Sequence, residues 1–260
     1  MINQIRATYA SAVQQWHQLT FGSSNLTFHA ATIPMAAVLA WIAMQRGDAS
    51  VLSYLLIGLP LMTIWGGVAF RIGYTLTTEI GNQILQFVYI SRTPVIFVAL
   101  GKALAQVIWG LPTGLVSFGV VYLVTRTPLH VEHVGPLIVS LILVIVGMAI
   151  ASLFFSPLMV LVGGRGGFFN TVIPFGLVLS GFVFPVDRLP IVLQVLARLV
   201  PTSWAMDAVW LSIKGTESAG PLLSAWGMCI LTSFTLSGIT YLMFRGVEKK
   251  LRMTGTRDYY

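Results

Sequence analysis

The polar side chains that could take part in chemistry are few and scattered. His130 and His133 flank Glu132, and all three can ligate zinc, but a metal site needs at least one more converging ligand, so a solvated loop is the default interpretation. The only cysteine, Cys229, lies in an apolar run and has no second cysteine for a disulfide or a metal site. The long apolar runs hold no carboxylate for a proton relay. The sequence therefore predicts no catalytic residue, no metal site and no cofactor bound by this chain.

A glycine-rich segment at residues 163–167, GGRGG, is the one stretch that invites comparison with a phosphate-binding loop. A Walker A loop has the pattern G-x-x-x-x-G-K-[ST], in which the lysine reaches the phosphates and the hydroxyl binds Mg²⁺. The segment lacks the lysine, the hydroxyl and a preceding strand, so we interpret it as a tight turn. An ATP-driven activity would need its ATPase, with ATP and Mg²⁺, from a separate polypeptide.

The composition excludes a soluble globular protein. Hydrophobic residues make up 56% of the 260 residues and charged residues only 9%, which is too little to cover a water-facing surface. The formal net charge of +7 comes from basic residues dispersed between apolar runs rather than grouped with aromatic residues. This pattern fits membrane topology better than a nucleic-acid partner, and we expect none.

Six apolar runs without Asp, Glu, Lys or Arg are long enough, or nearly so, to cross a hydrocarbon core of about 30 Å. They cover residues 28–44, 51–70, 103–124, 136–162, 168–184 and 221–244. Five of them contain a proline in their interior, which membrane helices tolerate as a kink. We therefore predict an all-α, polytopic membrane protein with six transmembrane helices, built as one domain over residues 1–260.

The distribution of lysine and arginine predicts the orientation. With the N-terminus inside, ten of these residues lie in inner segments and five in outer ones, so the positive-inside rule places both termini in the cytoplasm. Residues 1–27 lack the apolar core of a signal peptide. Instead, Ile5, Tyr9 and Trp16 recur at helical spacing between polar residues, which is typical of an amphipathic interfacial helix. We expect a multi-pass protein of a bacterial inner (plasma) membrane, in contact with membrane lipids.

Two connections between the apolar runs are long. The inner one, residues 71–102, includes a segment from about Thr78 to Ser91 with apolar residues on one helical face, which suits a groove on a soluble partner. A plain surface helix would show the same periodicity, and this alternative interpretation stays open. The outer one, residues 185–220, holds two short amphipathic runs separated by Pro201, each too short to span. We predict that they form a pair of re-entrant or interfacial helices before the last span.

The outer connection carries a family resemblance. Residues 180–190, SGFVFPVDRLP, and 199–210, LVPTSWAMDAVW, are similar to the signature of type 2 ABC exporter (ABC-2) permeases. In that family an aromatic-Pro pair ends the fifth helix, and a later Pro-x-x-aromatic-x-x-Asp marks the outer helix pair. Residues 82–94, NQILQFVYISRTP, are similar to the segment by which these permeases meet their nucleotide-binding partner. Glycine and proline punctuation also occurs in unrelated hydrophobic helices, which is the alternative interpretation.

The resemblance implies a permease that works by alternating access with two copies of a separate ABC ATPase subunit, which bind ATP and Mg²⁺, and with a second permease subunit, identical or homologous. The residues expected to couple to the ATPase are Glu79, Ile84, Phe87, Val88 and Arg92. Those expected at an outer gate are Phe184, Pro185, Pro190, Pro201, Trp204 and Asp207. Aromatic candidates for the substrate path are Trp65, Phe70, Tyr74, Trp109 and Phe118.

One of these residues needs a partner. Asp207 stands among apolar and aromatic neighbours, and a buried carboxylate requires a hydrogen bond or a cation. The nearest cations in sequence are Arg198 and Arg188. We therefore expect one of the two to pair with it.

The cargo has alternatives. Apolar walls favour an amphipathic or lipid-linked substrate, such as a drug, a lipid or a glycolipid, and the outer connection is nearer to the drug and lipo-oligosaccharide branch of the family. Residues 82–94 are nearer to the polysaccharide and teichoic-acid branch, although Ile90 and Ser91 replace its aromatic residue and proline. A non-transport membrane scaffold or an intramembrane enzyme, which would need no ATPase, stays open as a rival.

Overall fold

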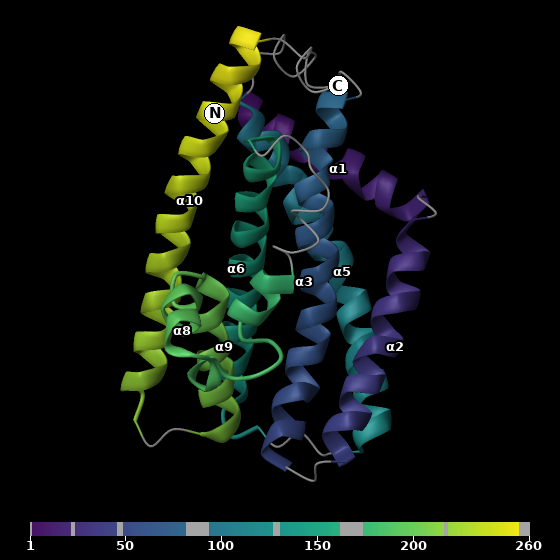
Figure 1. Cartoon of the computed structure of the whole chain (residues 1–260), viewed down its shortest axis with the longest axis vertical. Helices are drawn as coiled ribbons and strands as arrows, with labels where there is room; N and C mark the ends of the chain where they lie inside the picture. Colours follow the sequence, from purple (N-terminus) through teal and green to yellow (C-terminus); the bar gives the residue numbers. More distant parts are fainter. Residues whose placement is uncertain are drawn as a thin grey trace.

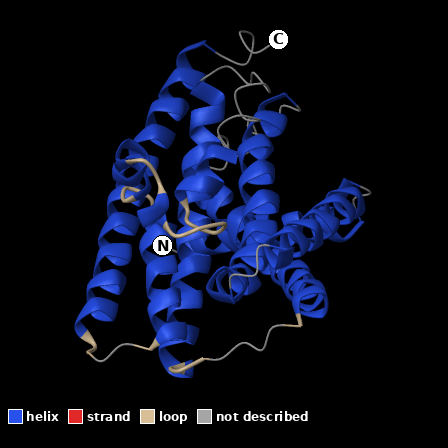
Figure 2. Cartoon of the chain, turned by 60° about the horizontal axis from the view of Figure 1, so that its bottom comes forward, coloured by secondary structure: helices blue, strands red, loops and turns tan. Residues whose placement is uncertain are grey.

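The computed structural model describes residues 2–21, 24–45, 49–81, 94–126, 131–161, 174–215 and 218–254, and over these ranges the chain consists of helices and loops without a strand (Figure 2). The long helices are α1 (Ile2–Phe21), α2 (Ser24–Gln45), α3 (Ala49–Gly81), α5 (Val95–Thr125), α6 (Val134–Leu161) and α10 (Gly220–Thr254). The short ones are a helix at 174–179, the 3-10 helix η1 (Val186–Arg188), α8 (Ile191–Ala197) and α9 (Pro201–Lys214). The prediction of an all-α protein is confirmed.

Four of the described helices are long and apolar enough to cross a membrane, and they coincide with the second, third, fourth and sixth predicted runs. These spans are Leu52–Ala69 within α3, Val95–Thr125, Val134–Leu161 and Gly220–Lys249 within α10. The first run lies in α2, whose described apolar part, Ile33–Gln45, is shorter. The chain is therefore a multi-pass membrane protein.

The fifth predicted run is only partly described, since residues 162–173 lie outside the described ranges. Its helix ends at residue 179, before the predicted end at Phe184. The reason is local: Gly181 has a φ of +74°, in the left-handed region that glycine adopts without a Cβ clash. Tyr54 of α3 donates its hydroxyl hydrogen to the carbonyl oxygen of Gly181, so the backbone of this turn is satisfied inside the protein.

Helix α3 lies at the centre and packs against α2, α5 and α6, while α6 also packs against α9 and α10 (Figure 1). Trp65 is only 1% exposed, and its ring lies 6.1 Å from the rings of both Phe155 and Phe182. A Cβ at Gly58 would overlap the backbone carbonyl oxygen of Phe182. The missing side chain thus lets the turn after helix 174–179 sit directly on α3.

The two ends of the molecule differ. Helix α1 crosses the bundle near the C-terminal end of α10, whereas α9 leads into α10 toward the opposite end (Figure 1).

The predicted inner connection is partly helical: α3 continues through Arg71 to Gly81, and α5 begins at Val95. Thr78 is therefore inside α3 and does not start a separate helix, because this stretch contains no proline and a lone glycine does not end a helix. Residues 82–93 lie outside the described ranges.

Candidate functional site

The outer connection is organised by its prolines. Pro185 directly precedes η1, Pro190 directly precedes α8, and Pro201 is the first residue of α9 rather than a separator between helices. Proline suits these places because its ring fixes φ near the helical value and its missing N–H would be unpaired in a first turn anyway. The predicted pair of short helices is present, and a 3-10 turn precedes it.

Arg198, at the end of α8, is the centre of a polar cluster between the short helices. Its guanidinium binds the carboxylates of Asp207 and Asp187, the latter at 3.0 Å. It also stacks on the ring of Trp204, 4.4 Å from the ring centroid, and the indole N–H of Trp204 donates to the carbonyl oxygen of Arg198 at 2.9 Å. Of the two predicted partners of Asp207, the structure therefore selects Arg198, while Arg188 is exposed.

The two carboxylates of this cluster differ in environment. The side chain of Asp207 is 27% exposed, like that of Arg198, whereas the side chain of Asp187 is 79% exposed. Burial raises the pKa of Asp207, the bond and charge of Arg198 oppose that shift, and nearby Asp187 adds to it. Arg198 is thus needed to offset the cost of placing a charge at this half-buried position.

Neutral hydrogen bonds close the ends of the short helices. Ser203 donates its hydroxyl hydrogen to the carbonyl oxygen of Ala197 at 2.7 Å, and the side-chain amide of Gln194 donates to the carbonyl oxygen of Leu189 at 2.8 Å. Phe184 is half-buried and packs on a small apolar cluster that includes Leu189 and Ala197. The outer connection is therefore a folded unit with its own core and not an extended link.

Helix α9 packs against α6 and α10, and its C-terminal end also contacts α3 and the loop before α6. The ring of Trp210 meets that of Tyr54 on α3 edge to face at 5.2 Å. The backbone N–H of His133 donates to the carbonyl oxygen of Ser212 at 3.2 Å, which satisfies a carbonyl in the last turn of α9. The loop considered as a metal site therefore has a structural role through its backbone, while His130 lies outside the described residues.

Of the residues predicted to couple to an ATPase, Glu79 alone belongs to a described helix. Glu79 is in the last turn of α3, with its side chain outside the described set, and Ile84, Phe87, Val88 and Arg92 are outside the described residues altogether. Their roles stay predictions.

The start of α5 is capped by a residue that the sequence did not indicate. Pro94 occupies the N-cap of α5 and has no side-chain hydrogen bond to offer. The free N–H of Val95 instead donates to a carboxylate oxygen of Glu248 on α10, at 2.7 Å. A negative charge is favourable there because the first amide groups of a helix carry partial positive charge. Pro94 signalled the need for a cap, but nothing in its neighbourhood indicated an acceptor from a distant helix.

Three of the aromatic residues predicted for a substrate path have described side chains, and their surroundings differ. Trp65 is in the core, Trp109 contacts an aromatic ring of α1, and Phe118 stacks on a ring one turn further along α5. Phe70 and Tyr74 lie on α3 with side chains outside the described set. Their assignment to a path stays a prediction.

Helix α1 packs on α5 with an unexpected face. Its polar residues Ser11 and Gln15 are buried, and the side-chain amide of Gln15 donates to that of Gln106 on α5 at 3.4 Å. A Cβ at Gly101 of α5 would overlap the backbone of Thr8, so the two helices approach closely where they cross. These two polar residues of α1 therefore face the protein, while Arg6, Gln14 and Gln18 are exposed.

The comparison with known families gives one match. Residues 6–213 match the family model described as ABC-2 type transporter. The matched range is well over half of the chain and includes both the segment after α3 and the outer helix pair. No curated protein matches the chain at a significant level.

Proposed function

Because the chain belongs to the ABC-2 type transporter family, we propose that it is the transmembrane permease subunit of an ATP-driven exporter. It pairs with a second permease, identical or homologous, and binds two copies of a separate ABC ATPase, which holds ATP and Mg²⁺. The observation that carries this proposal is that one family match runs without a break from α1 to the end of α9. It thus includes the elements needed at both faces of a transporter.

The proposed topology has six transmembrane helices: the four described spans, α2, and the run that ends at the turn around Gly181. Both termini are cytoplasmic, in the inner membrane of a bacterium. In support, α1 and the basic C-terminal part of α10 lie at the same end of the bundle (Figure 1). Helices α8 and α9, with 7 and 14 residues, are too short to span and form a re-entrant or interfacial pair at the outer face.

The proposed coupling element is the segment between α3 and α5, with Glu79 and Arg92 near its ends. Helix α3 connects this segment to the outer helix pair. Its 33 residues form one helix about 50 Å long. Tyr54, near the start of α3, is bonded to Gly181 and contacts Trp210 of α9. A tilt imposed on α3 at the inner face by ATP binding would therefore displace the outer helix pair.

The proposed gate is that outer pair, over the seam between two permease subunits. One chain has too few helices to enclose a path for a bulky substrate, and dimerisation supplies the other wall. The Arg198 cluster and the hydrogen bonds of Ser203 and Gln194 favour movement of the pair as a unit. Alternating access then consists of opening this unit outward when the ATPase subunits close.

The proposed cargo is amphipathic or lipid-linked, since the described spans expose almost entirely apolar side chains. The alternative is a polysaccharide or teichoic-acid chain, favoured by the resemblance of residues 82–94 to that branch.

The test is reconstitution in lipid vesicles with the ABC ATPase encoded nearest to the gene. We expect ATPase activity to rise in the presence of this chain and a fluorescent lipid to be moved in an ATP-dependent way. Glu79→Lys and Arg92→Glu should lower both activities together, because a reversed charge repels the surface that it was placed against. Arg188→Glu, an exposed charge reversal at the opposite end, is the matched control. If the ATPase binds and both inner variants stimulate it as strongly as the unaltered chain does, the segment has no part in the mechanism. If no ATPase binds, the result favours a scaffold.

A further inference from the structure

Helix α1 buries two polar side chains against α5 and exposes large apolar side chains beside polar ones such as Arg6 and Gln14. Its polar residues Ser11 and Gln15 are buried against α5, while Ile5, Tyr9 and Trp16 are exposed, Tyr9 at 72%. In water this arrangement would be unfavourable, because large apolar side chains would stay hydrated while polar ones were buried. The exposed face of α1 therefore requires an apolar environment.

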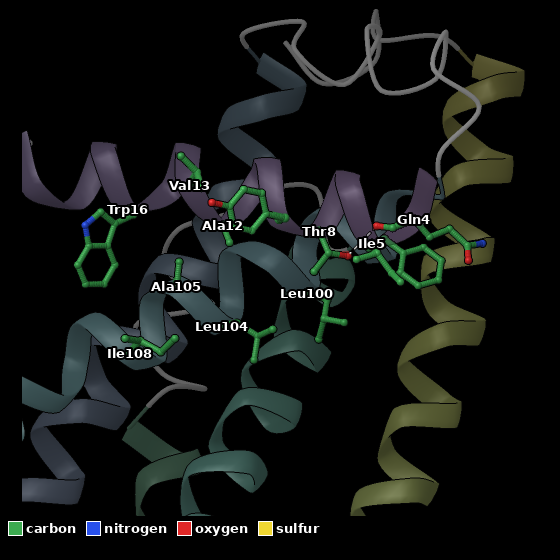
Figure 3. Close-up of a pocket in the computed structure, with 12 residues that line it drawn as sticks. Gln4, Ile5, Thr8, Ala12, Val13, Trp16, Leu100, Leu104, Ala105 and Ile108 are labelled. Atoms are coloured by element: carbon green, nitrogen blue, oxygen red, sulfur yellow. Dashed lines mark hydrogen bonds between the residues drawn. The ribbon is translucent and has the colours of Figure 1, made fainter. Parts of the chain in front are cut away.

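That face forms one wall of a groove, and α5 forms the other (Figure 3). The groove has a volume of about 660 Å³, within the range of small-molecule sites. Its lining is almost entirely apolar, and its principal residues are Ile5, Tyr9, Val13, Leu100, Leu104 and Ile108. It is open along one side, which suits a long, narrow apolar group that enters sideways.

The position of the groove along α5 gives its depth in a bilayer. The 31 residues of α5 extend about 46 Å, against a hydrocarbon core of about 30 Å, so several residues at each end lie at the headgroup level. The groove is within the first half of α5, next to this boundary. Tyr9 and Trp16 are the residue types enriched at membrane interfaces, and Arg6, which follows the lining residue Ile5 in α1, is exposed and carries the positive charge that attracts a lipid phosphate.

The groove also continues into the membrane-facing surface of α5. Leu104 and Ile108 are exposed, and Leu115 and Leu123 continue the exposed apolar row along the same helix. We infer that the groove between α1 and α5 is a binding site for one acyl chain of a phospholipid of the adjacent leaflet, with its phosphate near Arg6. This inference goes beyond the proposed function, because it needs neither an ATPase nor a cargo.

The test uses the purified full chain in vesicles of phosphatidylethanolamine and phosphatidylglycerol, with a phosphatidylglycerol that carries a photoactivatable group on an acyl chain. Labelling is mapped by peptide mass spectrometry. We expect strong labelling of the peptides that line the groove, and its yield should saturate as the fraction of probe is raised. Labelling around Leu115, which is 73% exposed and outside the groove, should rise in proportion to the probe.

Two variants make the test specific. Leu104→Trp fills the groove and should remove most labelling of α1, whereas the matched change Leu115→Trp on the same helix should leave it unchanged. Labelling of the groove that never saturates, or that is unaffected by Leu104→Trp, would mean bulk lipid only and would overturn the inference. A cross-link between α1 of one copy and α5 of another, in place of lipid labelling, would show that a second copy fills the groove and would also overturn it. The saturation measurement on the unaltered chain decides the matter even if the tryptophan variant folds poorly.

Discussion

The structure of the Arg198 cluster predicts that its two half-buried members, Arg198 and Asp207, differ in the stability lost when each is removed. Replacing Arg198 with Ala leaves Asp207 half-buried with no cation, since Asp207 takes its charge-assisted bond from Arg198. Replacing Asp207 with Ala leaves Arg198 still bound to Asp187 at 3.0 Å and stacked on Trp204. Arg198→Ala should therefore cost more stability than Asp207→Ala.

The magnitude follows from the exposure of the pair. Fully exposed ion pairs contribute about 0–1 kcal/mol, and removing one partner of a buried pair costs about 3–5 kcal/mol. At 27% exposure on both sides we expect an intermediate cost for Arg198→Ala, about 2 kcal/mol, and about 1 kcal/mol for Asp207→Ala. The double variant should cost no more than Arg198→Ala alone, because the second change removes the unpaired carboxylate.

The assay is a double-mutant cycle on the purified chain, by equilibrium unfolding in mixed micelles. Equal costs for the two single variants, or costs that simply add in the double variant, would refute the assigned pairing. The charge-swapped pair Arg198→Asp with Asp207→Arg should recover only part of the loss, because the new carboxylate at 198 would face Asp187. Export by Asp207→Ala should fall if the outer pair is a gate.

Three further predictions concern the same regions. Because folding raises the pKa of Asp207, the stability that this group contributes is complete below the ordinary aspartate pKa and is lost as the pH rises through the raised pKa. The free energy of unfolding of the unaltered chain, measured relative to that of Asp207→Asn, should therefore fall from acidic to neutral pH. A rise over the same range would contradict the burial of Asp207. Replacing Pro190 and Pro201 together with Ala should loosen the helix starts, lower export and raise basal ATPase activity, whereas unchanged values for both would mean that the outer pair only connects helices. A cysteine that replaces Ser218 should react with an impermeant thiol reagent in intact cells, and one that replaces Thr256 should not. Labelling at Thr256 would contradict the proposed orientation.

The sequence predicted what depends on local properties. Run length and hydropathy identified four spans that the structure contains, because burial in lipid is a property of each helix taken alone. The prolines located the short outer helices, because each restricts the backbone where it stands. The pairing of Asp207 was narrowed to two arginines, since both are close in sequence.

What could not be predicted depends on contacts between distant residues. The bond from Gln15 to Gln106 joins residues 91 apart and holds a polar side chain of α1 against α5. The bond from Val95 to Glu248 joins residues 153 apart. Neither leaves a periodic signal, because each depends on how whole helices cross.

The bond between Val95 and Glu248 has a consequence for the order of biosynthesis. Helix α5 emerges from the ribosome long before α10, so its first amide group has no carboxylate partner while the intervening helices are made and inserted. Only when the C-terminal helix is in place does Glu248 reach it. A nascent or truncated chain that lacks residue 248 would leave the start of α5 uncapped, together with the segment that leads into it. Completion of translation thus becomes a condition for capping the start of α5.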